Sequence, residues 1–233
     1  MKAIILAGGE GTRLRPLTSE IPKGMVRIRG KTITEHVIGI LKRAGIMEIY
    51  LSVGYKKEMM KEFYGDGKKF GARLAYVEED PPLGTAGPLI VLNRLGQQLK
   101  ETFMMVNGDN LLDVDIREML KFHLAHGALA TIALTGVKDP KHFGVAMLDG
   151  DKITEFIEKP RRPPSNLVNS GYYLLEPEVF SIVARKERAM MERDVFPELA
   201  RRGKLFGFRC EGAWFDTGTH ERLREVEEKW RLK

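Results

Sequence analysis

The sequence has little cysteine and no long apolar run. Cys210 is the single cysteine among 233 residues, so no disulfide can form within the chain, as is typical of a reducing cytosol. Cys210 ends a predicted strand and is expected to be a buried structural thiol. No stretch approaches the ~20 apolar residues that span a bilayer, and Gly8 and Gly9 end the apolar N-terminal segment too early for a signal peptide. We therefore expect a cytoplasmic protein without a membrane anchor.

The features of a nucleic-acid-binding protein are also missing. Lys and Arg number 38 against 32 Asp and Glu, and the net charge of +6 favours anionic ligands. These cations are spread along the chain rather than gathered in a basic tail or an Arg-rich helix, so nucleic acid is not an expected partner. The hydrophobic content of 43% is sufficient for a full core. The length fits one large α/β domain or two small ones.

No linker rich in Gly, Ser or Pro divides the chain, and no hexapeptide repeat is present. We therefore expect one domain over residues 1–233, with two halves (1–128 and 129–233) of different character. The first half alternates predicted strands and helices, which favours a mixed, mostly parallel sheet with helices on both faces and ligands at the carboxyl ends of its strands. The predicted strands are 3–7, 48–53, 73–77, 102–106, 130–135, 144–148, 152–158, 166–175 and 205–210, and the predicted helices are 33–44, 56–64, 85–95, 115–126 and one that begins near Thr219.

The most informative motif follows the first predicted strand. Residues 8–18 read Gly-Gly-Glu-Gly-Thr-Arg-Leu-Arg-Pro-Leu-Thr, and Pro22-Lys23 comes shortly afterwards. Glycines in such a loop let backbone N–H groups approach phosphate oxygens. Arg13 offers a planar fork of donors and Lys23 a point charge, so the pair can hold adjacent phosphates of a triphosphate. Outside such a motif, two cations of this kind are usually solvated surface residues.

This loop differs from two common nucleotide motifs. The dinucleotide fingerprint needs a third glycine where Leu14 stands, and the P-loop sequence is absent. The run instead resembles the signature of the sugar-1-phosphate nucleotidyltransferases, which reads G-G-x-G-T-R-L-x-P-L-T followed by P-K. Gly24 departs from this pattern, because the family usually has Pro or Ala there, and it could loosen the segment that aims Lys23.

The resemblance covers nearly the whole chain. It implies a GT-A-like (Rossmann-like) α/β domain that transfers a nucleoside monophosphate from an NTP to a sugar 1-phosphate, releases pyrophosphate and uses Mg²⁺. Residues 1–128 would bind the nucleotide, and a β-rich second half, residues 129–233, would bind the sugar phosphate. Many relatives carry a C-terminal β-helix of hexapeptide repeats, which this sequence lacks. The residues expected to bind nucleotide are Leu6, Ala7, Gly8, Gly9, Gly11, Thr12, Arg13, Lys23, Glu79, Gly84 and Thr85.

Asp109 and Asp216 are the candidates for holding Mg²⁺. Each follows an apolar segment that reads as a strand, and each matches a family position that holds the metal. Mg²⁺ usually takes one or two protein carboxylates while it bridges phosphate oxygens. The alternatives are that Asp109 caps a turn and that Asp216 caps the helix near Thr219.

Three further segments resemble the sugar-phosphate site of the family. Residues 156–160 read F-I-E-K-P, in which Glu158 would accept hydrogen bonds from two sugar hydroxyls and Lys159 would hold the phosphate. Residues 168–171 resemble V-N-T-G, and residues 143–145 resemble Y-G-V. The alternative for Glu158 and Lys159 is an exposed ion pair at the end of a strand. The implied sugar contacts are Asn107, Gly144, Glu158, Lys159, Asn169 and Gly171, and the implied catalytic residues are Arg13, Lys23, Asp109 and Lys159.

Residues 78–87 bear on the choice of base. Their L-G-T-A-G run resembles the mannose-1-phosphate guanylyltransferase branch, and Glu79 falls where thymidylyl and uridylyl enzymes tend to have Gln. A carboxylate can accept both N–H groups of guanine, whereas it would repel the carbonyls of thymine and uracil. Glu79 therefore favours GTP, unless it is only a solvated residue of an acidic loop.

GTP with mannose 1-phosphate is the first expectation for the substrates. Glucose 1-phosphate with dTTP or UTP is the alternative, and heptose-1-phosphate guanylyltransferases have similar motifs. A non-catalytic regulatory subunit is a further possibility, which the presence of Arg13, Lys23 and Asp109 disfavours. The identity of the sugar, assembly into a homo-oligomer and allosteric control are not determined by the sequence.

Overall fold

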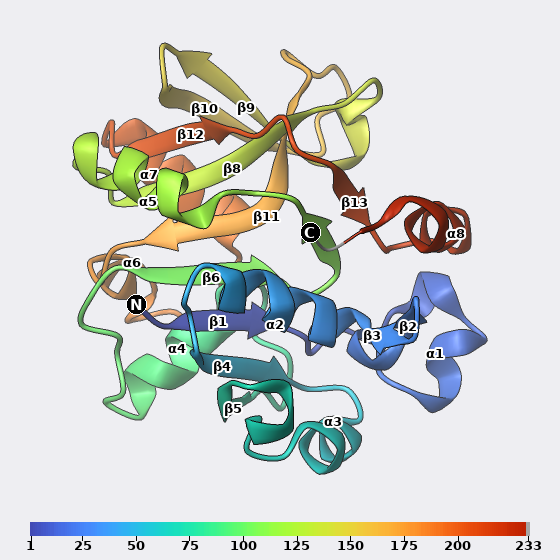
Figure 1. The fold of residues 1–233 in the computed structure, drawn as a ribbon. Helices are drawn as coiled ribbons and strands as arrows, with labels where there is room; N and C mark the ends of the chain where they lie inside the picture. Colours follow the sequence, from blue (N-terminus) through green and yellow to red (C-terminus); the bar gives the residue numbers. More distant parts are fainter. Residues whose placement is uncertain (232–233) are drawn as a thin grey trace. The chain divides into compact units, whose positions relative to one another are not determined.

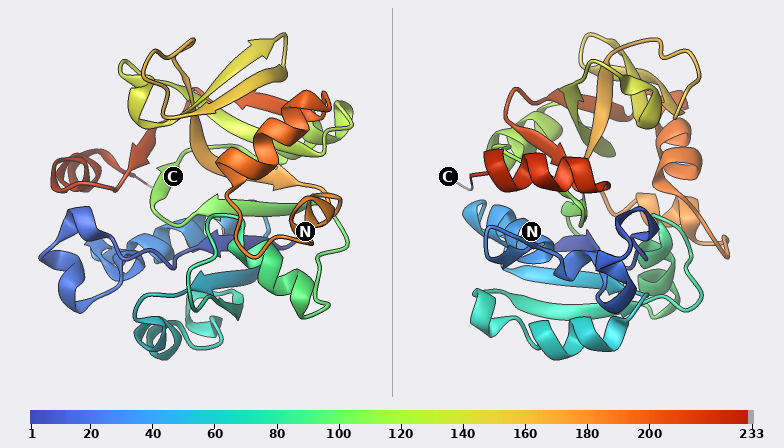
Figure 2. Two further views of the ribbon diagram at one scale, coloured as in Figure 1. Left: turned by 180° about the vertical axis from the view of Figure 1, so that it is seen from behind. Right: turned by 90° about the vertical axis from the view of Figure 1, so that its right-hand side faces the viewer.

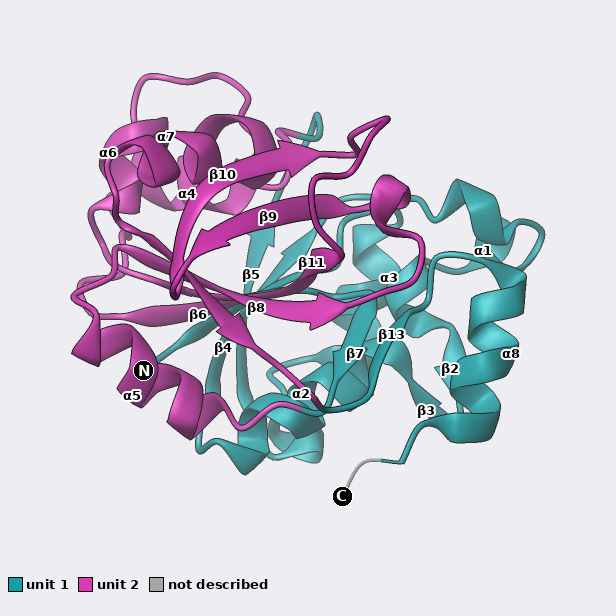
Figure 3. Cartoon of the chain, turned by 90° about the horizontal axis from the view of Figure 1, so that it is seen from above, with its two compact units in different colours: residues 1–82, 106–113, 212–233 teal, residues 83–105, 114–211 magenta. Residues whose placement is uncertain are grey.

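The computed structural model describes residues 1–231, and contacts within the chain define two compact units (Figure 3). Unit 1 comprises residues 1–82, 106–113 and the segment from Gly212 onward, and unit 2 comprises residues 83–105 and 114–211. Each unit draws on segments that are distant in sequence. The division of function between residues 1–128 and 129–233 remains a prediction.

Unit 1 is built on parallel strands. β1 (Ala3–Leu6) pairs with β4 (Glu48–Val53), and β4 pairs with β5 (Arg73–Glu78), in both cases in parallel (Figure 1). The chain passes from β1 to β4 through α2 (Ile33–Arg43) and from β4 to β5 through α3 (Lys57–Tyr64). These connections are long enough for the crossovers that parallel strands require.

Residues at the two ends of α2 determine where this helix begins and ends. Thr32 Oγ1 accepts the N–H of Glu35 at 3.1 Å, and Glu35 Oε2 accepts the N–H of Thr32 at 2.7 Å, which completes the predicted capping box. Gly45, directly after the helix, takes a φ of 82° that favours glycine. The apolar face of the helix is buried as its periodicity predicts, with Ile33, Val37, Ile40 and Leu41 in the core.

The C-terminal segment of unit 1 contributes a short ribbon and a helix. β13 (Trp214–Asp216) pairs antiparallel with β7 (Asn110–Leu112), and α8 (His220–Lys229) follows after one turn. Thr219 caps α8 as predicted, because its Oγ1 accepts the N–H of Arg222 at 3.3 Å.

This C-terminal segment packs on the N-terminal part of the same unit. Trp230 is buried, and its Nε1–H donates to His36 Nδ1 at 3.2 Å. The backbone N–H of Arg29 donates to Glu227 Oε2 at 2.8 Å. The views of Figure 2 show α8 beside the loop that carries α1 (Leu17–Glu20). The remaining short elements of unit 1 are η1 (Thr12–Leu14), η2 (Lys23–Met25), β2 (Arg27–Ile28), β3 (Lys31–Thr32) and η3 (Lys68–Phe70).

Unit 2 is the β-rich part of the chain. Its strands lie in the order β11 (Leu167–Leu175), β8 (Ala130–Gly136), β12 (Leu205–Arg209), β10 (Lys152–Glu158) and β9 (Gly144–Asp149). β12 pairs with β8 in parallel, whereas β11–β8, β10–β12 and β10–β9 are antiparallel. The α/β class with a mixed sheet is therefore confirmed, with parallel pairing of β1, β4 and β5 in unit 1 and largely antiparallel pairing in unit 2.

The helices of unit 2 are short. They are α4 (Gly87–Arg94), α5 (Ile116–Ala125), α6 (Val179–Val183) and α7 (Phe196–Arg201), together with the 3₁₀ turn η4 (Pro140–His142) and the π-helical turn η5 (Met191–Val195). β6 (Phe103–Asn107) is divided between the units after Met105. Cys210 follows β12 and is half-buried, and burial raises the pKa of its thiol to about 12, which fits the structural role expected for it. No helix among residues 1–231 combines the length and apolar character that crossing a bilayer requires.

Candidate active site

The glycine loop begins where β1 ends. The N–H of Ala7 donates to Ser52 O at 3.0 Å, which ties the loop to β4. On the other side, the N–H of Gly108 donates to Leu6 O at 2.9 Å. A Cβ on Gly108 would lie 2.5 Å from that same oxygen, so only glycine permits this approach. The ends of β1 and β6 are therefore adjacent, and Asp109 lies beside the start of the loop.

Within the loop, Gly11 holds the turn toward Lys23. Gly11 has a φ of 65°, and its carbonyl accepts the Thr18 hydroxyl at 2.7 Å. A Cβ on Gly11 would lie 3.0 Å from Lys23 Cβ, so the lysine stem packs directly against the loop. Gly8 is half-buried, whereas Gly9 and Thr12 are exposed and accessible to a ligand.

Lys23 forms an ion pair with Asp109. Lys23 Nζ lies 2.6 Å from Asp109 Oδ2, and the lysine side chain is 11% exposed against 37% for the aspartate. Desolvation raises the pKa of Asp109, but the charge of Lys23, its hydrogen bond and the charge of Arg13 outweigh desolvation and leave this pKa below its usual value. Asp109 is therefore a carboxylate at neutral pH. Lys23 of the sequence motif and Asp109, a candidate metal ligand, therefore lie in contact.

Gly24 does not loosen the turn that carries Lys23. It is buried, and a Cβ there would lie 2.6 Å from Thr34 Oγ1 and 3.2 Å from Met60 Cε. Neighbouring side chains fill the space that Pro or Ala would occupy. Packing therefore fixes this turn, and the expectation of a loosened segment is wrong.

The antiparallel pairing of β13 with β7 places Asp216 next to the segment that contains Asp109. Asp216 lies opposite Asn110 in the register, and the N–H and Oγ1 of Thr217 both donate to the Asp109 carbonyl, at 3.0 and 2.8 Å. Asp216 Oδ2 is paired with Arg222 Nη1. Its other oxygen, Oδ1, is buried and has no hydrogen-bond partner in the protein. A buried oxygen of this kind calls for a cation or donor from outside the chain.

The carboxylate oxygens available at this site suit Mg²⁺. Asp109, in the turn between β6 and β7, and Asp216, at the end of β13, are hard oxygen ligands, and one buried oxygen of the pair is unsatisfied. Residues 1–231 contain no cluster of three or more His, Cys, Asp or Glu side chains arranged to hold a metal. The remaining ligands would be water and substrate oxygens, which is how Mg²⁺ is usually held.

The guanidinium of Arg13 lies close to Gly218, as does the carboxylate of Asp216. A Cβ on Gly218 would lie 2.7 Å from Asp216 Oδ1 and 2.9 Å from Arg13 Nη2. Glycine at this position leaves room for the guanidinium beside the carboxylate. Arg13 is exposed, so its remaining donors are accessible to phosphate oxygens.

Glu79 is held by a partner that the sequence does not indicate. Ser52 Oγ donates to Glu79 Oε1 at 2.7 Å, and the N–H of Glu79 donates to Val53 O at 3.0 Å. Ser52 is buried, and Glu79 is half-buried. The structure therefore orients the Glu79 carboxylate, which a solvated loop residue would not need.

The L-G-T-A-G run in unit 2 is hydrogen-bonded to residues 189–192. The N–H of Ala86 donates to Ala189 O at 3.0 Å, and Gly84 has a φ of 94° that brings it against the same carbonyl. Thr85 Oγ1 donates to Glu192 Oε2 at 2.5 Å and accepts the N–H of Met191 at 2.8 Å. These bonds hold Thr85 outside the helix, which explains why α4 begins at Gly87 rather than at residue 85.

The segments expected to bind sugar phosphate gather around the start of β9. Gly144 lies opposite Glu158, and a Cβ on Gly144 would lie 3.0 Å from Glu158 Oε2 and would overlap the Phe156 ring. Lys159 has a φ of 50°, which is costly for a lysine and marks a conformation that the surroundings impose. Its Nζ lies 3.3 Å from Glu158 Oε1, and its side chain is 64% exposed.

Asn169 and Gly171 form a bulge in β11 next to these residues. Val168 pairs with Val145 of β9, and the register then shifts after Asn169. Gly171 takes a φ of 83°, and its N–H donates to Asn169 Oδ1 at 2.8 Å, while Asn169 Nδ2 donates to the Tyr173 hydroxyl at 2.8 Å. Asn169 is therefore fixed by its own strand. Asn107 ends β6 in unit 1 and is half-buried, two residues before Asp109.

Comparison with known proteins identifies the family. The sequence model of the family described as nucleotidyl transferase matches residues 2–231. The chain belongs to the nucleotidyl transferase family. Its relatives include mannose-1-phosphate guanyltransferase beta-B of Xenopus laevis, which is 38% identical over 221 residues, 94% of this chain and 61% of the relative. The catalytic subunit beta of the Drosophila melanogaster mannose-1-phosphate guanylyltransferase is 38% identical over 93% of this chain and 59% of its own length. The chain thus spans about three fifths of the length of these curated relatives.

Solved structures agree with this membership. A Bacillus anthracis protein described as a glucose-1-phosphate thymidylyltransferase, in complex with a sucrose, has a TM-score of 0.88 and 30% identity and is matched over 100% of this chain and 97% of its own. HddC from Yersinia pseudotuberculosis has a TM-score of 0.83 and 25% identity, with 99% of each chain covered. A UDP-glucose pyrophosphorylase complexed with UDP-glucose has a TM-score of 0.82 at 22% identity, with 97% of this chain and 96% of that chain covered, which supports the fold alone.

In this member of the family, three polar residues at the candidate sites lie outside the sequence motifs described above. Ser52 orients Glu79, Glu192 receives the Thr85 hydroxyl, and Arg222 pairs with Asp216. Burial raises the pKa of Glu192, although the bond from Thr85 acts in the opposite direction. The sequence offered one signal that Ser52 has a polar partner. Ser52 stands between Leu51 and Val53 in a predicted strand, and a buried hydroxyl requires a hydrogen-bond partner.

Proposed function

We propose that this chain transfers a nucleoside monophosphate from an NTP to a sugar 1-phosphate and releases pyrophosphate. The observation that carries the proposal is the meeting of Lys23, Asp109 and Asp216 beside the glycine loop, with the Asp216 Oδ1 atom buried and unsatisfied. A binding-only domain would not need a carboxylate kept ionised by a lysine next to a second carboxylate.

In the proposed reaction, a phosphate oxygen of the sugar 1-phosphate attacks the α-phosphorus of the NTP in line. The new P–O bond forms as the bond from the α-phosphorus to its bridging oxygen breaks, and the electron pair leaves with pyrophosphate. No covalent enzyme intermediate is needed, so the protein contributes positioning and charge stabilisation. Arg13 and Lys23 would bind the departing phosphates, and the backbone N–H groups near Gly8 and Gly11 would orient them.

Asp109 and Asp216 would hold Mg²⁺. When bound, the ion neutralises charge on the phosphate oxygens. Glu158 would accept hydrogen bonds from two sugar hydroxyls, and Lys159 would hold the sugar phosphate. The backbone at Gly144 keeps space open in front of Glu158, because any Cβ there would press on the carboxylate. Asn107, Asn169 and Gly171 would complete the sugar contacts.

GTP and mannose 1-phosphate are the proposed substrate pair. Support comes from the Glu79 carboxylate, which Ser52 holds in place, and from the relatives named as mannose-1-phosphate guanylyltransferases. Glucose 1-phosphate with dTTP or UTP is the second candidate, because the Bacillus anthracis neighbour is described as a glucose-1-phosphate thymidylyltransferase. We also propose a cytoplasmic location, which the single half-buried cysteine supports.

The test is pyrophosphate release from a panel of NTPs and sugar 1-phosphates with Mg²⁺. We expect the highest kcat/KM with GTP and mannose 1-phosphate. Asp109→Asn should be inactive, whereas Asp149→Asn, at the exposed end of β9, should match the wild type. Binding of NTP without pyrophosphate release from any pair would refute the proposed enzyme and favour a regulatory subunit.

A further inference from the structure

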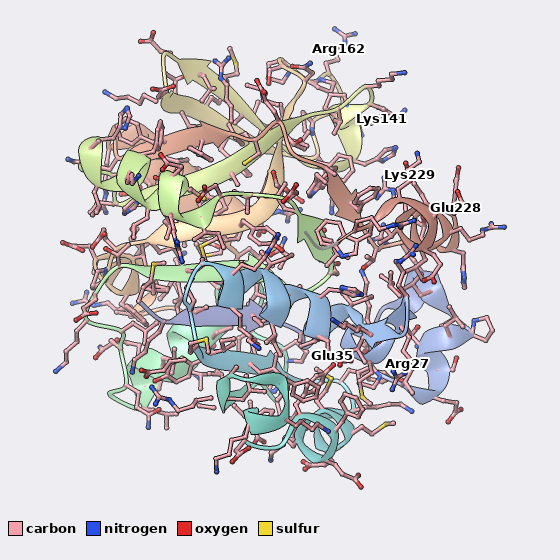
Figure 4. The ribbon with its side chains drawn as sticks, in the orientation of Figure 1. Arg27, Glu35, Lys141, Arg162, Glu228 and Lys229 are labelled. Atoms are coloured by element: carbon pink, nitrogen blue, oxygen red, sulfur yellow. The ribbon has the colours of Figure 1, made fainter. Side chains whose placement is uncertain are left out.

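Arg222 is the counter-ion of a proposed metal ligand. Its Nη1 is bonded to Asp216 Oδ2, and the two side chains are 31% and 13% exposed. The backbone of Arg222 is fixed as well, because its N–H is the one that Thr219 caps at the start of α8. Other charged residues of the helix, including Glu228 and Lys229, are exposed to solvent (Figure 4). Arg222 is thus placed toward the site rather than toward solvent.

The other carboxylate of the site has its own cation. Lys23 Nζ is paired with Asp109 Oδ2, and Arg13 acts on the same carboxylate. Asp109 and Asp216 therefore share their surroundings with three cations, which leaves this cluster with a net positive charge before any ligand binds. A free divalent cation is repelled by such a cluster, whereas a metal–nucleotide complex, which carries net negative charge, is attracted.

We propose that Arg222 lowers the affinity of Asp216 for a free divalent cation, so that the metal enters together with the nucleotide. The proposal rests on the proposed function in one respect, the assignment of Asp216 as a metal ligand. Arg222 occupies Oδ2 and leaves Oδ1 available to one cation. The arginine thus acts as a positioning residue, which pairs with the Asp216 carboxylate in place of a free cation.

A purely structural role makes a different prediction. If Arg222 only anchors α8, its removal lowers the stability of the protein and leaves metal affinity unchanged. If Arg222 competes with the metal, its removal tightens binding of a cation to the nucleotide-free protein. Metal binding and thermal unfolding therefore separate the two roles, and neither readout depends on catalysis.

The experiment titrates Mn²⁺ into nucleotide-free protein and follows free Mn²⁺ by electron paramagnetic resonance. We expect weak binding by the wild type and binding at least about tenfold tighter by Arg222→Gln, since removing a unit charge a few ångström from a metal has at least this effect near a protein surface. Arg222→Lys should stay close to the wild type because it keeps the charge. Arg224→Gln, on the exposed side of the same helix, is the matched control and should also remain unchanged.

Two outcomes overturn the proposal. One is an Arg222→Gln variant whose Mn²⁺ affinity equals that of the wild type. The other is tightening that persists in the double variant Arg222→Gln/Asp216→Asn, because the effect would then not involve Asp216. Arg222→Met, which keeps most of the aliphatic stem, is the second variant if the glutamine form does not fold. If neither folds, Arg222 acts in folding and the proposal is wrong.

A separate arm tests the assignment on which the inference rests. Asp216→Asn in the wild-type background is titrated with preformed Mn²⁺–GTP and with GTP alone, and the gain in affinity due to the metal is compared with that of the wild type, because GTP chelates Mn²⁺ by itself. If it binds the metal as the wild type does, Asp216 is not a ligand and that part of the proposed function fails. If it loses binding while Arg222→Gln behaves as the wild type, only the role of Arg222 is refuted.

Discussion

Replacing Lys23 with alanine should weaken NTP binding far more than replacing Lys159. Lys23 is 11% exposed and packs against Gly11 of the glycine loop, which is the segment proposed to bind the triphosphate. A hydrogen bond to a charged group contributes about 1.5–3 kcal/mol, which corresponds to roughly 10- to 150-fold in Kd. Lys159 is 64% exposed and belongs to the segment that carries Glu158, so its loss should leave the Kd for GTP almost unchanged.

The assay is calorimetric titration of GTP into each variant without sugar phosphate. Lys100→Ala, an exposed lysine outside both sites, controls for the general loss of positive charge. The opposite pattern, with Lys159→Ala weakened and Lys23→Ala unchanged, would refute the assignment of the two subsites.

The same variant should change the pH dependence of turnover. The pKa of Asp109 is held below its usual value because the effects of Lys23 and Arg13 exceed desolvation, which acts in the upward direction. Without Lys23, less positive charge opposes the effect of desolvation. The pKa of Asp109 therefore rises, and the fraction of ionised carboxylate falls at mildly acidic pH. The acid limb of kcat/KM should therefore move to higher pH in Lys23→Ala. An unmoved acid limb would show that Lys23 does not control the charge of Asp109.

Four further substitutions test separate parts of the site. Asp109→Asn should slow Mg²⁺-dependent turnover by about 10²-fold or more while the protein stays folded, and wild-type activity at limiting Mg²⁺ would exclude Asp109 as a ligand. Glu79→Gln should lower kcat/KM for GTP by roughly 5- to 150-fold and raise that for UTP and dTTP, because its NH₂ would face a guanine donor but could pair with a pyrimidine carbonyl. Ser52→Ala should shift selectivity in the same direction by a smaller factor, and unchanged GTP-to-UTP ratios in both variants would remove Glu79 from base recognition. Gly24→Ala should destabilise the protein by about 1–3 kcal/mol through overpacking against Thr34, measured by thermal unfolding, and an unchanged Tm would contradict the packing described for this turn.

The sequence predicted those elements that local chemistry determines. α2 was predicted from a capping box and a 3.6-residue apolar period, and the structure contains both. The parallel strands β1, β4 and β5 of unit 1 were predicted because they read as short, mostly apolar runs bounded by turns, whereas the short strands β2, β3 and β7 were not predicted. The family was identified from residues 8–18, where nearly every position of the motif is present.

Short and non-local features were not predictable in the same way. α1 and the π-helical turn η5 are too short to produce a periodic pattern. The parallel pairing of β12 with β8 depends on which strand lies beside which, and a strand's own sequence does not specify its neighbour.

Two of the polar pairs described above depend on such non-local placement. Ser52 meets Glu79 only through the register of β4 and β5, and the sequence offers no reason to connect them. Arg222 looks like an ordinary charged residue of an exposed helix. Its pairing with Asp216 follows from the position at which Thr219 starts α8.

³¹P NMR of a single reaction can show whether this chain joins a nucleoside monophosphate to a sugar 1-phosphate. With GTP, mannose 1-phosphate and Mg²⁺, we expect the resonances of both substrates to be replaced by those of a sugar nucleotide and pyrophosphate in equal amounts, and we expect Asp109→Asn to leave the substrates unchanged. If GTP and the other NTPs bind but no sugar nucleotide forms with any sugar 1-phosphate, or if pyrophosphate appears together with free nucleoside monophosphate instead, the proposed transfer reaction is refuted.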